Sequence, residues 1–363
     1  MKEELFIQVP KQLSRREFLK VAGATGLGAF LVACGANPTA TSEAVERTMA
    51  IQPWPGSYED IFKKYVYEPF TAKTGVKITS TPQAEWYNLA KIKQEVDSGN
   101  PTLDISVQLP GDVVRGGKDG LFEEINVASV PMTADLFDQA KALLPWGLGY
   151  LVYSYGIGYR PGTGDYSSWW DIWDPKYAGR LSLGKTETTY VVQTINRLIT
   201  GKMSPVDTDA VFAKLDELKP NIKKMFESDA DLRNMYNAEE IDAFVFFNGR
   251  VAVQQDDGID VLFSSPSEGA FAAFDFLCIT KNSKNKDIAQ EFINFSLEPE
   301  QQVNIGKYMH YGPTNKTVTF DDPKYCAVMP CGGAMDSLWF EDAEYVSENQ
   351  DAWIERWNEW LAG

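Results

Sequence analysis

Histidine is nearly absent from this chain of 363 residues, since His310 is the only one. A Ser-His-Asp triad or a multi-histidine metal centre therefore has at most one imidazole available. No nucleophile with an accompanying base can be identified either. The sequence predicts a protein that is not an enzyme and that holds no metal ion or cofactor. We expect His310 to be a partly exposed residue at a helix end.

Long apolar runs are also scarce. The longest, Val21–Ala33, has thirteen small or apolar residues, fewer than the roughly 20 that a membrane-spanning helix needs. The remainder, with 44% hydrophobic residues in the whole chain, is typical of a soluble globular body. Basic residues are outnumbered, with 34 Lys and Arg against 51 Asp and Glu and a formal net charge of −17. This charge disfavours nucleic acid and anionic lipid as partners.

The first 34 residues resemble bacterial sorting signals. Ser14–Lys20 has the pattern of a twin-arginine export signal, and the apolar run that follows it ends in Leu-Val-Ala-Cys, which is similar to a lipoprotein box. The resemblance implies that residues 1–33 are removed and that Cys34 is acylated. Residues 34–48 then form the acylated Cys and a flexible linker. We expect an exported lipoprotein that is anchored to a membrane and faces the periplasm or the cell exterior; a buried N-terminal helix is the alternative.

Short apolar runs alternate with helical patterns from about residue 49 onward. Phe62 and Phe70 share a helix face, Ser57 is the predicted cap of that helix, and Val76–Ser80 alternates like a strand. The alternation of strands with helices predicts parallel pairing, so the fold class is α/β. The roughly 330 residues that follow the signal exceed what one hydrophobic core serves, which predicts two lobes.

One motif imitates a nucleotide site. Gly179–Thr186 fits the phosphate-loop pattern letter for letter. That loop needs a hydrophobic strand before its first glycine and a helix directly after its lysine. Here Asp174–Ala178 is polar, and Arg180–Leu183 itself has the pattern of a strand. We therefore predict no nucleotide at this motif.

The remaining three cysteines fall into two groups. Cys278 lies in an apolar run, where a buried, inert thiol is expected. Cys326 and Cys331 are close enough in sequence to close a small disulfide loop. A twin-arginine substrate folds before it meets an oxidising compartment, so the bonded and the free state both stay open.

Several segments match one family in order along the chain. They lie within Trp54–Glu59, Glu68–Val76, Gly156–Tyr159, Trp170–Arg180, Lys219–Asn221, Phe247–Arg250, Asp275–Thr280 and Tyr311–Asn315. This ordered set resembles the spermidine/putrescine-type extracellular solute-binding proteins. The resemblance implies the α/β fold of the periplasmic-binding-protein type II class, with two lobes joined by a two-strand hinge.

The resemblance also implies the domain organisation and the partners. Crossing strands are expected near Tyr155–Tyr159 and Phe274–Ile279, which gives residues 49–154 plus 280–363 to lobe 1 and 155–279 to lobe 2. A monomer of this kind captures a small solute between its lobes and delivers it to the permease subunits of an ABC importer.

A polyamine is the favoured ligand, such as putrescine or spermidine. Its methylene stem suits aromatic walls and its ammonium ends suit carboxylates. The resemblance places Asp275 at the amine-binding carboxylate of the family and Tyr311 at a later pocket aromatic. The full set of candidate binding residues is Trp54, Ser57, Tyr58, Asp112, Glu187, Phe247, Asn248, Asp275 and Tyr311.

The chain departs from the well-known polyamine binders at several positions. Phe247 and Ala273 stand where those proteins carry Trp, and Glu187 alone remains of an expected acidic pair. Another small amine or an amino-acid-like solute is therefore an alternative ligand. A ligand-sensing module for a receptor and an exported enzyme are the alternative functions. No Tyr-Tyr pair is present, which disfavours ferric iron as the ligand.

Overall fold

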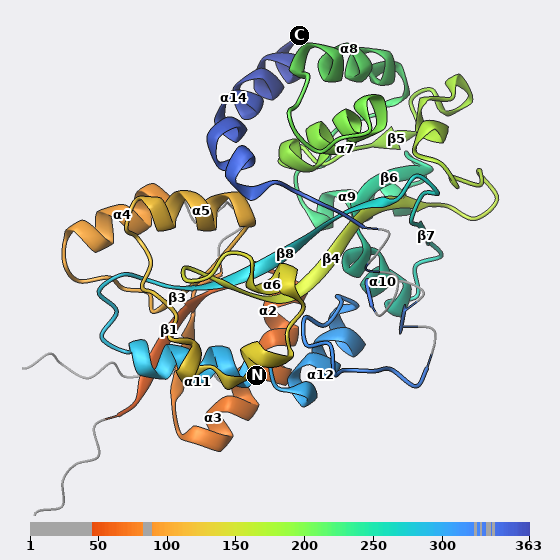
Figure 1. Ribbon diagram of the computed structural model, residues 1–363. Helices are drawn as coiled ribbons and strands as arrows, with labels where there is room; N and C mark the ends of the chain where they lie inside the picture. Colours follow the sequence, from red (N-terminus) through yellow and green to blue (C-terminus); the bar gives the residue numbers. More distant parts are fainter. Residues whose placement is uncertain (1–45, 83–88, 323–324, 327–328, 332–334, 336–337) are drawn as a thin grey trace, which may run out of the picture. The chain divides into compact units, whose positions relative to one another are not determined.

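The computed structural model describes residues 46–82, 89–322, 325–326, 329–331, 335 and 338–363 (Figure 1). The predicted export signal and the predicted acylation site at Cys34 lie outside the described residues. In the described part of the chain, no helix has both the length and the apolar character required to span a membrane.

One mixed sheet of nine strands organises the described chain. The strands are β1 Thr48–Gln52, β2 Lys77–Ser80, β3 Ile105–Gln108, β4 Leu148–Tyr159, β5 Leu181–Ser182, β6 Ala243–Phe247, β7 Leu262–Ser264, β8 Ala270–Ile279 and β9 Leu338–Phe340. Their order is β2-β1-β3-β8-β4-β6-β5, while β7 pairs with β4 and β9 pairs with β8. The pairs β1–β2, β1–β3 and β5–β6 are parallel, and the predicted α/β fold class is confirmed.

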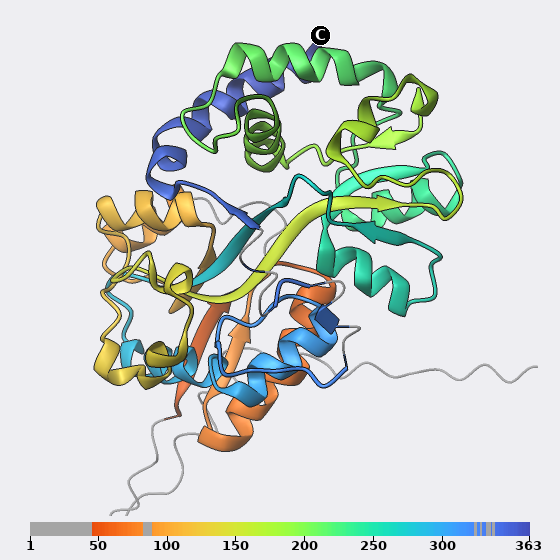
Figure 2. The same ribbon diagram turned by 45° about the vertical axis from the view of Figure 1, so that its right-hand side comes forward.

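Two long strands connect a first strand group, β1–β3, with a second strand group, β5–β7. The C-terminal half of β8 pairs with β3, the C-terminal half of β4 pairs with β6, and β4 and β8 pair with each other in antiparallel fashion. Figure 2 shows β4 in yellow and β8 in teal running between the two groups. The segments expected to cross, Tyr155–Tyr159 and Phe274–Ile279, belong to these two strands. The lobe boundaries stay a prediction.

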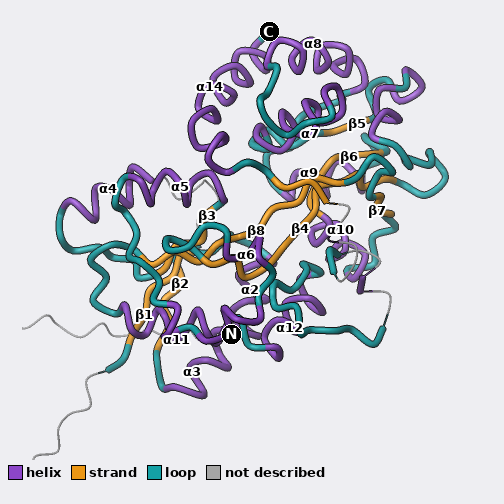
Figure 3. The backbone as a smooth tube through the Cα atoms, in the orientation of Figure 1, coloured by secondary structure: helices purple, strands orange, loops and turns teal. Residues whose placement is uncertain are grey.

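Helices alternate with the strands along most of the chain (Figure 3). They are α2 Ser57–Phe62, α3 Glu68–Thr74, α4 Leu89–Asp97, α5 Pro110–Lys118, α6 Asp138–Lys141, α7 Thr188–Thr200, α8 Thr208–Leu218, α9 Asp229–Asn237, α10 Asn248–Asp256, α11 Lys286–Ser296, α12 Pro299–Met309 and α14 Ala343–Ala362. Because the helices after β1, β5 and β6 begin where those strands end, their N-terminal turns gather at the carboxyl ends of the strands.

The first helical segment corrects one prediction. Its expected apolar face is buried and Gly75, at φ 74°, ends it, but a π-helical stretch at Lys63–Tyr67 separates α2 from α3. Ser57 is not the cap. Gly56 holds that position with a φ of 78°, a conformation that suits glycine, and the hydroxyl oxygen of Ser57 accepts a hydrogen bond from Arg250 instead.

The C-terminal helix α14 contacts elements beside both strand groups. It packs against α5 and α7. Gln350 Nε2 donates to Asp112 Oδ1 of α5 at 2.9 Å, and Trp357 Nε1 donates to the carbonyl of Lys185, just before α7, at 2.8 Å. In Figure 1, this dark blue helix runs from the neighbourhood of α5 to that of α8. It therefore forms a further connection between the two groups, alongside β4 and β8.

The structure agrees with the prediction made for Cys278 and shows the state of the other two described cysteines. Cys278 is free and buried, and burial raises the pKa of its thiol. Cys326 and Cys331 are joined as a disulfide, with a Cα–Cα distance of 5.6 Å. Of the two states that the sequence left open for this pair, the structure has the disulfide-bonded one.

The phosphate-loop pattern folds as a strand and a turn. β5 occupies Leu181–Ser182 inside the motif, and α7 begins at Thr188, after the motif has ended. Lys185 forms an ion pair with Glu227 at 2.9 Å. The local geometry is therefore the one expected from the strand-like Arg180–Leu183 pattern.

Candidate functional site

A cavity of about 430 Å³ lies at the carboxyl ends of β1, β5 and β6, with β4 and β8 also contributing to its wall. It is lined by aromatic, carboxyl, aliphatic and small side chains and by one arginine, namely Trp54, Pro55, Gly56, Tyr58, Leu109, Tyr153, Thr186, Glu187, Tyr190, Phe226, Glu227, Ser228, Asp229, Ala230, Phe246, Phe247, Arg250, Asp275 and Tyr311. Ligand pockets of α/β folds lie at this end of parallel strands and combine apolar walls with a few polar groups.

Asp275 provides a buried carboxyl group from the middle of β8. Only 2% of the residue is exposed. Its Oδ2 accepts hydrogen bonds from Trp54 Nε1 at 2.9 Å and from the Tyr58 hydroxyl at 3.0 Å. Burial raises its pKa to about 7, against the lowering effects of the Trp54 hydrogen bond and the positive charge of Arg250. A positively charged ligand group would favour the ionised form of this carboxyl group.

Glu187 provides a second carboxyl group from the N-cap position of α7. It is 9% exposed, and within the described residues no hydrogen bond to its carboxyl oxygens is formed. Burial raises its pKa to about 8, and the charge of Arg250 opposes this rise. An unpartnered carboxyl group in a cavity wall costs stability that a donor from a ligand would recover.

Arg250, in the first turn of α10, is the one cationic side chain among the lining residues that the structure describes. Its Nη1 donates to Ser57 Oγ at 3.0 Å. In the described part of the chain, no carboxylate lies within ion-pairing distance of this guanidinium. Its planar set of donors suits a carboxylate or a phosphate group. The cavity therefore presents both signs of charge.

Aromatic rings form the cavity wall between the charged groups. Tyr153 of β4 and Tyr190 of α7 share a hydrogen bond between their hydroxyl groups at 2.8 Å. Phe247 meets both rings edge-on, with centroid distances of 5.2 and 5.1 Å, and Tyr311 lies 5.6 Å from Tyr153. Such walls pack against methylene groups and attract cations.

The structure brings six of the nine candidate residues together around the cavity, and they are Trp54, Tyr58, Glu187, Phe247, Asp275 and Tyr311. Three others do not line it. Ser57 contacts Arg250, and Asp112 accepts the hydrogen bond from Gln350 of α14. Asn248 is fully buried, where its side chain accepts from the amide of Ser154 and donates to the carbonyl of His310.

Arg250, Tyr153 and Tyr190 also line the cavity and are not among the residues predicted from the sequence. Arg250 follows a buried strand directly and opens a helix, a position that brings side chains to the carboxyl edge of a sheet. That signal was available in the sequence. The two tyrosines sit within apolar runs that predict core residues, so no comparable signal marked them.

His310 does end a helix, as expected, because it is the C-cap of α12 with a φ of 56°. It is not partly exposed, however. Only 7% of the residue is accessible, and its Nε2 lies 2.7 Å from Asp256 Oδ2 of α10. This contact joins the C-terminal ends of α10 and α12.

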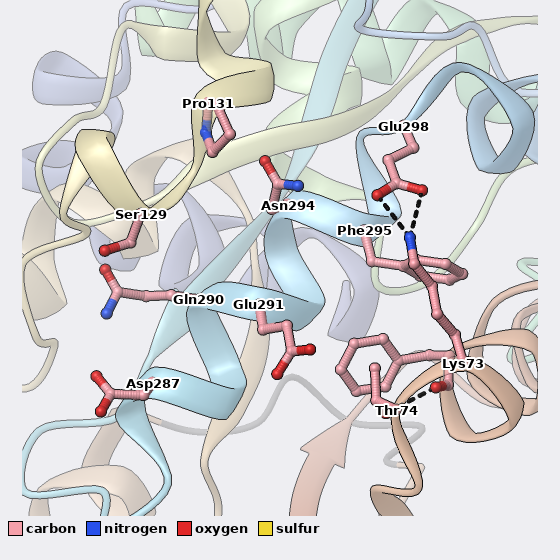
Figure 4. Close-up of a pocket in the computed structure, with 11 residues that line it drawn as sticks. Lys73, Thr74, Ser129, Pro131, Asp287, Gln290, Glu291, Asn294, Phe295 and Glu298 are labelled. Carbon is pink, nitrogen blue, oxygen red and sulfur yellow. Dashed lines mark hydrogen bonds and ion pairs between the residues drawn. The ribbon is translucent and has the colours of Figure 1, made fainter.

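A second, peripheral hollow of about 460 Å³ lies beside α3 and α11 (Figure 4). Lys73 pairs with Glu298 at 3.0 Å on one side of it, while Asp287, Gln290 and Ser129 lie on the other side. The charged side chains of this pair are 56% and 30% exposed. Water and a partner already satisfy them, so the hollow offers a ligand little to gain.

Comparison with known proteins identifies a family that the chain matches over most of its length. Residues 66–327 match the sequence model described as bacterial extracellular solute-binding protein. The γ-aminobutyric acid-binding protein of Pseudomonas aeruginosa is 25% identical over 89% of this chain and 93% of its own length. The spermidine/putrescine-binding periplasmic protein of Escherichia coli is 27% identical over 68% of this chain and 73% of its own length.

A solved structure agrees at the level of the whole fold. The crystal structure of an ABC transporter substrate-binding protein from Bradyrhizobium japonicum superposes with a TM-score of 0.77 and 25% identity. The match covers 87% of this chain and all of that one. The names of the two curated relatives thus specify different small amines.

Proposed function

This chain belongs to the bacterial extracellular solute-binding proteins, and we propose that it captures a small solute in the central cavity for an ABC importer. The relatives are named as binding proteins for small solutes and not as enzymes. The proposal therefore assigns no catalytic step to the cavity. It assigns the delivery of the bound solute to permease subunits in the membrane.

The proposed ligand is a small molecule with an ammonium group at one end and a carboxylate at the other, such as 4-aminobutanoate. One observation carries this choice: Arg250 lines the same cavity as Asp275 and Glu187 without forming an ion pair with either. The carboxylate of the ligand would meet the guanidinium, and the ammonium would meet the carboxyl groups. The name of the Pseudomonas relative, a γ-aminobutyric acid binder, supports the same class.

A polyamine remains the second candidate. The two buried carboxyl groups and the aromatic walls suit a diamine, and the Escherichia coli relative is named for spermidine and putrescine. Arg250 argues against it, because a second ammonium group next to a guanidinium is repelled in a poorly solvated cavity. We therefore propose the polyamine, which the sequence favoured, as the alternative ligand.

Calorimetric titration with a matched pair of ligands tests the choice. 4-Aminobutanoate and 1,4-diaminobutane have similar length and differ mainly at one end. We expect 4-aminobutanoate to bind at least about tenfold more tightly, since a charge-assisted hydrogen bond contributes about 1.5–3 kcal/mol. Tighter binding of the diamine would reverse the assignment. Failure of both ligands and of spermidine at millimolar concentration would exclude both classes.

The proposed location is outside the cytoplasmic membrane, held there by a lipid on Cys34. The family description as extracellular supports the location, and the twin-arginine and Leu-Val-Ala-Cys patterns support the export route and the anchor. Mass spectrometry of the mature protein tests this proposal. We expect an acylated N-terminal Cys34, and an unmodified N-terminus at another residue would contradict it.

A further inference from the structure

One short segment, Trp54–Tyr58, contacts the charged groups of both signs in the cavity. Trp54 and Tyr58 both donate to Oδ2 of Asp275. Ser57, between them in sequence, accepts from Nη1 of Arg250. The segment follows β1 and turns through Gly56 at a φ of 78° before α2 begins. Its backbone geometry therefore ties the position of the carboxyl group to the position of the guanidinium.

The backbone that carries Arg250 is fixed from another direction. Asn248 is hydrogen-bonded on both sides of its amide, to Ser154 and to His310. Gly249 has no room for a side chain, because a Cβ there would lie 2.3 Å from the ring of Tyr311 and 2.4 Å from the carbonyl oxygen of Met309. The first turn of α10 is thus held against the segment that contains Tyr311.

A fixed backbone does not by itself fix an arginine side chain, which has several rotatable bonds. Tyr311 contacts the guanidinium from the side of α12, and Ser57 supplies a further restraint from α2, an element that follows β1 of the first strand group. Arg250 belongs to α10, which follows β6 of the second strand group. The Ser57–Arg250 hydrogen bond therefore joins the two groups across the edge of the cavity.

We propose that Ser57 is a positioning residue that selects carboxylate-ended solutes by holding Arg250 in the cavity. This inference rests on the proposed function for the ligand class. It assigns selectivity to a residue that does not line the cavity. Because the segment Trp54–Tyr58 contacts both Asp275 and Arg250, the distance between the carboxyl group and the guanidinium depends on these five consecutive residues.

The test compares Ser57→Ala with Tyr58→Phe, using 4-aminobutanoate and 1,4-diaminobutane as probes in calorimetric titrations. Ser57→Ala is expected to weaken binding of 4-aminobutanoate about tenfold, the order of one charge-assisted hydrogen bond, and to leave the diamine unaffected. Tyr58→Phe is expected to weaken both probes by a similar factor, because both carry an ammonium group. Ser57→Thr keeps a hydroxyl group and should restore the wild-type ratio of the two affinities.

Equal weakening of both probes by Ser57→Ala, or weakening of neither, would overturn the inference. A measurement on the ligand-free protein distinguishes failure of this inference from failure of the proposed function. In 15N NMR spectra of the side chain of Arg250, the restricted rotation of the guanidinium should be lost in Ser57→Ala and retained in Tyr58→Phe. Unchanged rotation in Ser57→Ala rejects the positioning role whatever ligand the protein binds, whereas poor wild-type binding of 4-aminobutanoate with the expected NMR change rejects only the ligand class.

Discussion

The central cavity and the peripheral hollow have similar volumes, about 430 and 460 Å³. They differ in whether their charged side chains form ion pairs. In the hollow, Lys73 pairs with Glu298 at 3.0 Å and Glu291 pairs with Arg47 at 2.7 Å, in both cases near water. In the cavity, the guanidinium of Arg250 and the carboxyl groups are close enough to influence one another without pairing. The volume therefore does not distinguish the two regions, whereas the absence of ion pairs among the described buried titratable groups of the cavity does.

The two regions differ in ion pairing because their charged side chains are held in different ways. The carboxyl groups of the hollow rest on exposed helix surfaces, where side chains rotate to meet a partner. In the cavity, Asp275 is fixed in the middle of β8 and Arg250 is hydrogen-bonded to Ser57. These groups are prevented from collapsing onto each other, so a ligand can bridge them.

Replacement of Asp275 has the largest expected effect. Asp275→Asn removes the negative charge that faces a cationic ligand group while preserving the size of the side chain. We expect at least about a 100-fold loss of affinity for 4-aminobutanoate in calorimetric titrations, since a desolvated charge pair is lost. Glu298→Gln in the hollow is the matched control and should bind as the wild type does. Similar affinities for the two variants would remove the distinction between the two regions.

Glu187 should make binding depend on pH. Its pKa of about 8 in the ligand-free cavity means that the carboxyl group must lose a proton to pair with an ammonium group. Affinity for 4-aminobutanoate should therefore rise between pH 7 and 8, by up to about tenfold per unit. Glu187→Gln should lower the affinity at pH 8.5 by about tenfold and flatten this part of the profile. A wild-type profile without slope in this range would contradict the role of Glu187.

The ligand-free protein should respond to pH in the opposite sense. Asp275, Glu187 and Glu341 have pKa values raised by burial to about 7, 8 and 7. The folded state thus holds protons that the unfolded state releases near pH 4, so this stability is present at pH 4 and is lost as pH rises through 7 and 8.

Denaturant unfolding between pH 5 and 9 measures this trend. The free energy of unfolding should fall over this range, and the double variant Asp275→Asn, Glu187→Gln should show a smaller fall. Glu298→Gln serves as the control from the hollow, with an unchanged slope. A rise in stability towards pH 9 would show that the cavity carboxyl groups are ionised in the folded protein.

The smallest effect is expected in the hollow itself. Lys73→Ala removes an exposed ion pair that is screened by water, which contributes about 0–1 kcal/mol. Affinity for 4-aminobutanoate should not change, and the melting temperature should shift by no more than a few degrees. A large loss of affinity in this variant would show that the peripheral hollow is part of the binding site.

Much of the fold could be predicted because its signals are local. The spacing of Phe62 and Phe70 indicates the first helical segment, the alternation in Val76–Ser80 indicates β2, and the Arg180–Leu183 pattern indicates β5. The cap at Ser57 was wrong because glycine at position 56 can adopt a positive φ, which moves the cap back by one residue. Capping propensity also does not predict that the hydroxyl group of Ser57 accepts a hydrogen bond from Arg250, which is distant in sequence.

Six of the nine residues predicted for the site line the cavity, and three do not. Asn248 and Asp112 are polar residues near strand ends, a position shared by ligand-binding and structural side chains. Their hydrogen bonds to the backbone and to α14 are long-range contacts that no local pattern encodes. For the same reason, Tyr153 and Tyr190 could not be told apart from core tyrosines.

The position of β8 in the sheet determines when this protein can fold during its synthesis. Ile105 of β3 pairs with Ile279 of β8, roughly 170 residues later, and β4 pairs with β8 across more than about 100 residues. A nascent chain that stops before residue 270 lacks the strand between β3 and β4 and leaves both with exposed edges. The two strand groups therefore join into one sheet only after at least about three quarters of the chain has been synthesised, and such non-local pairing makes folding slow.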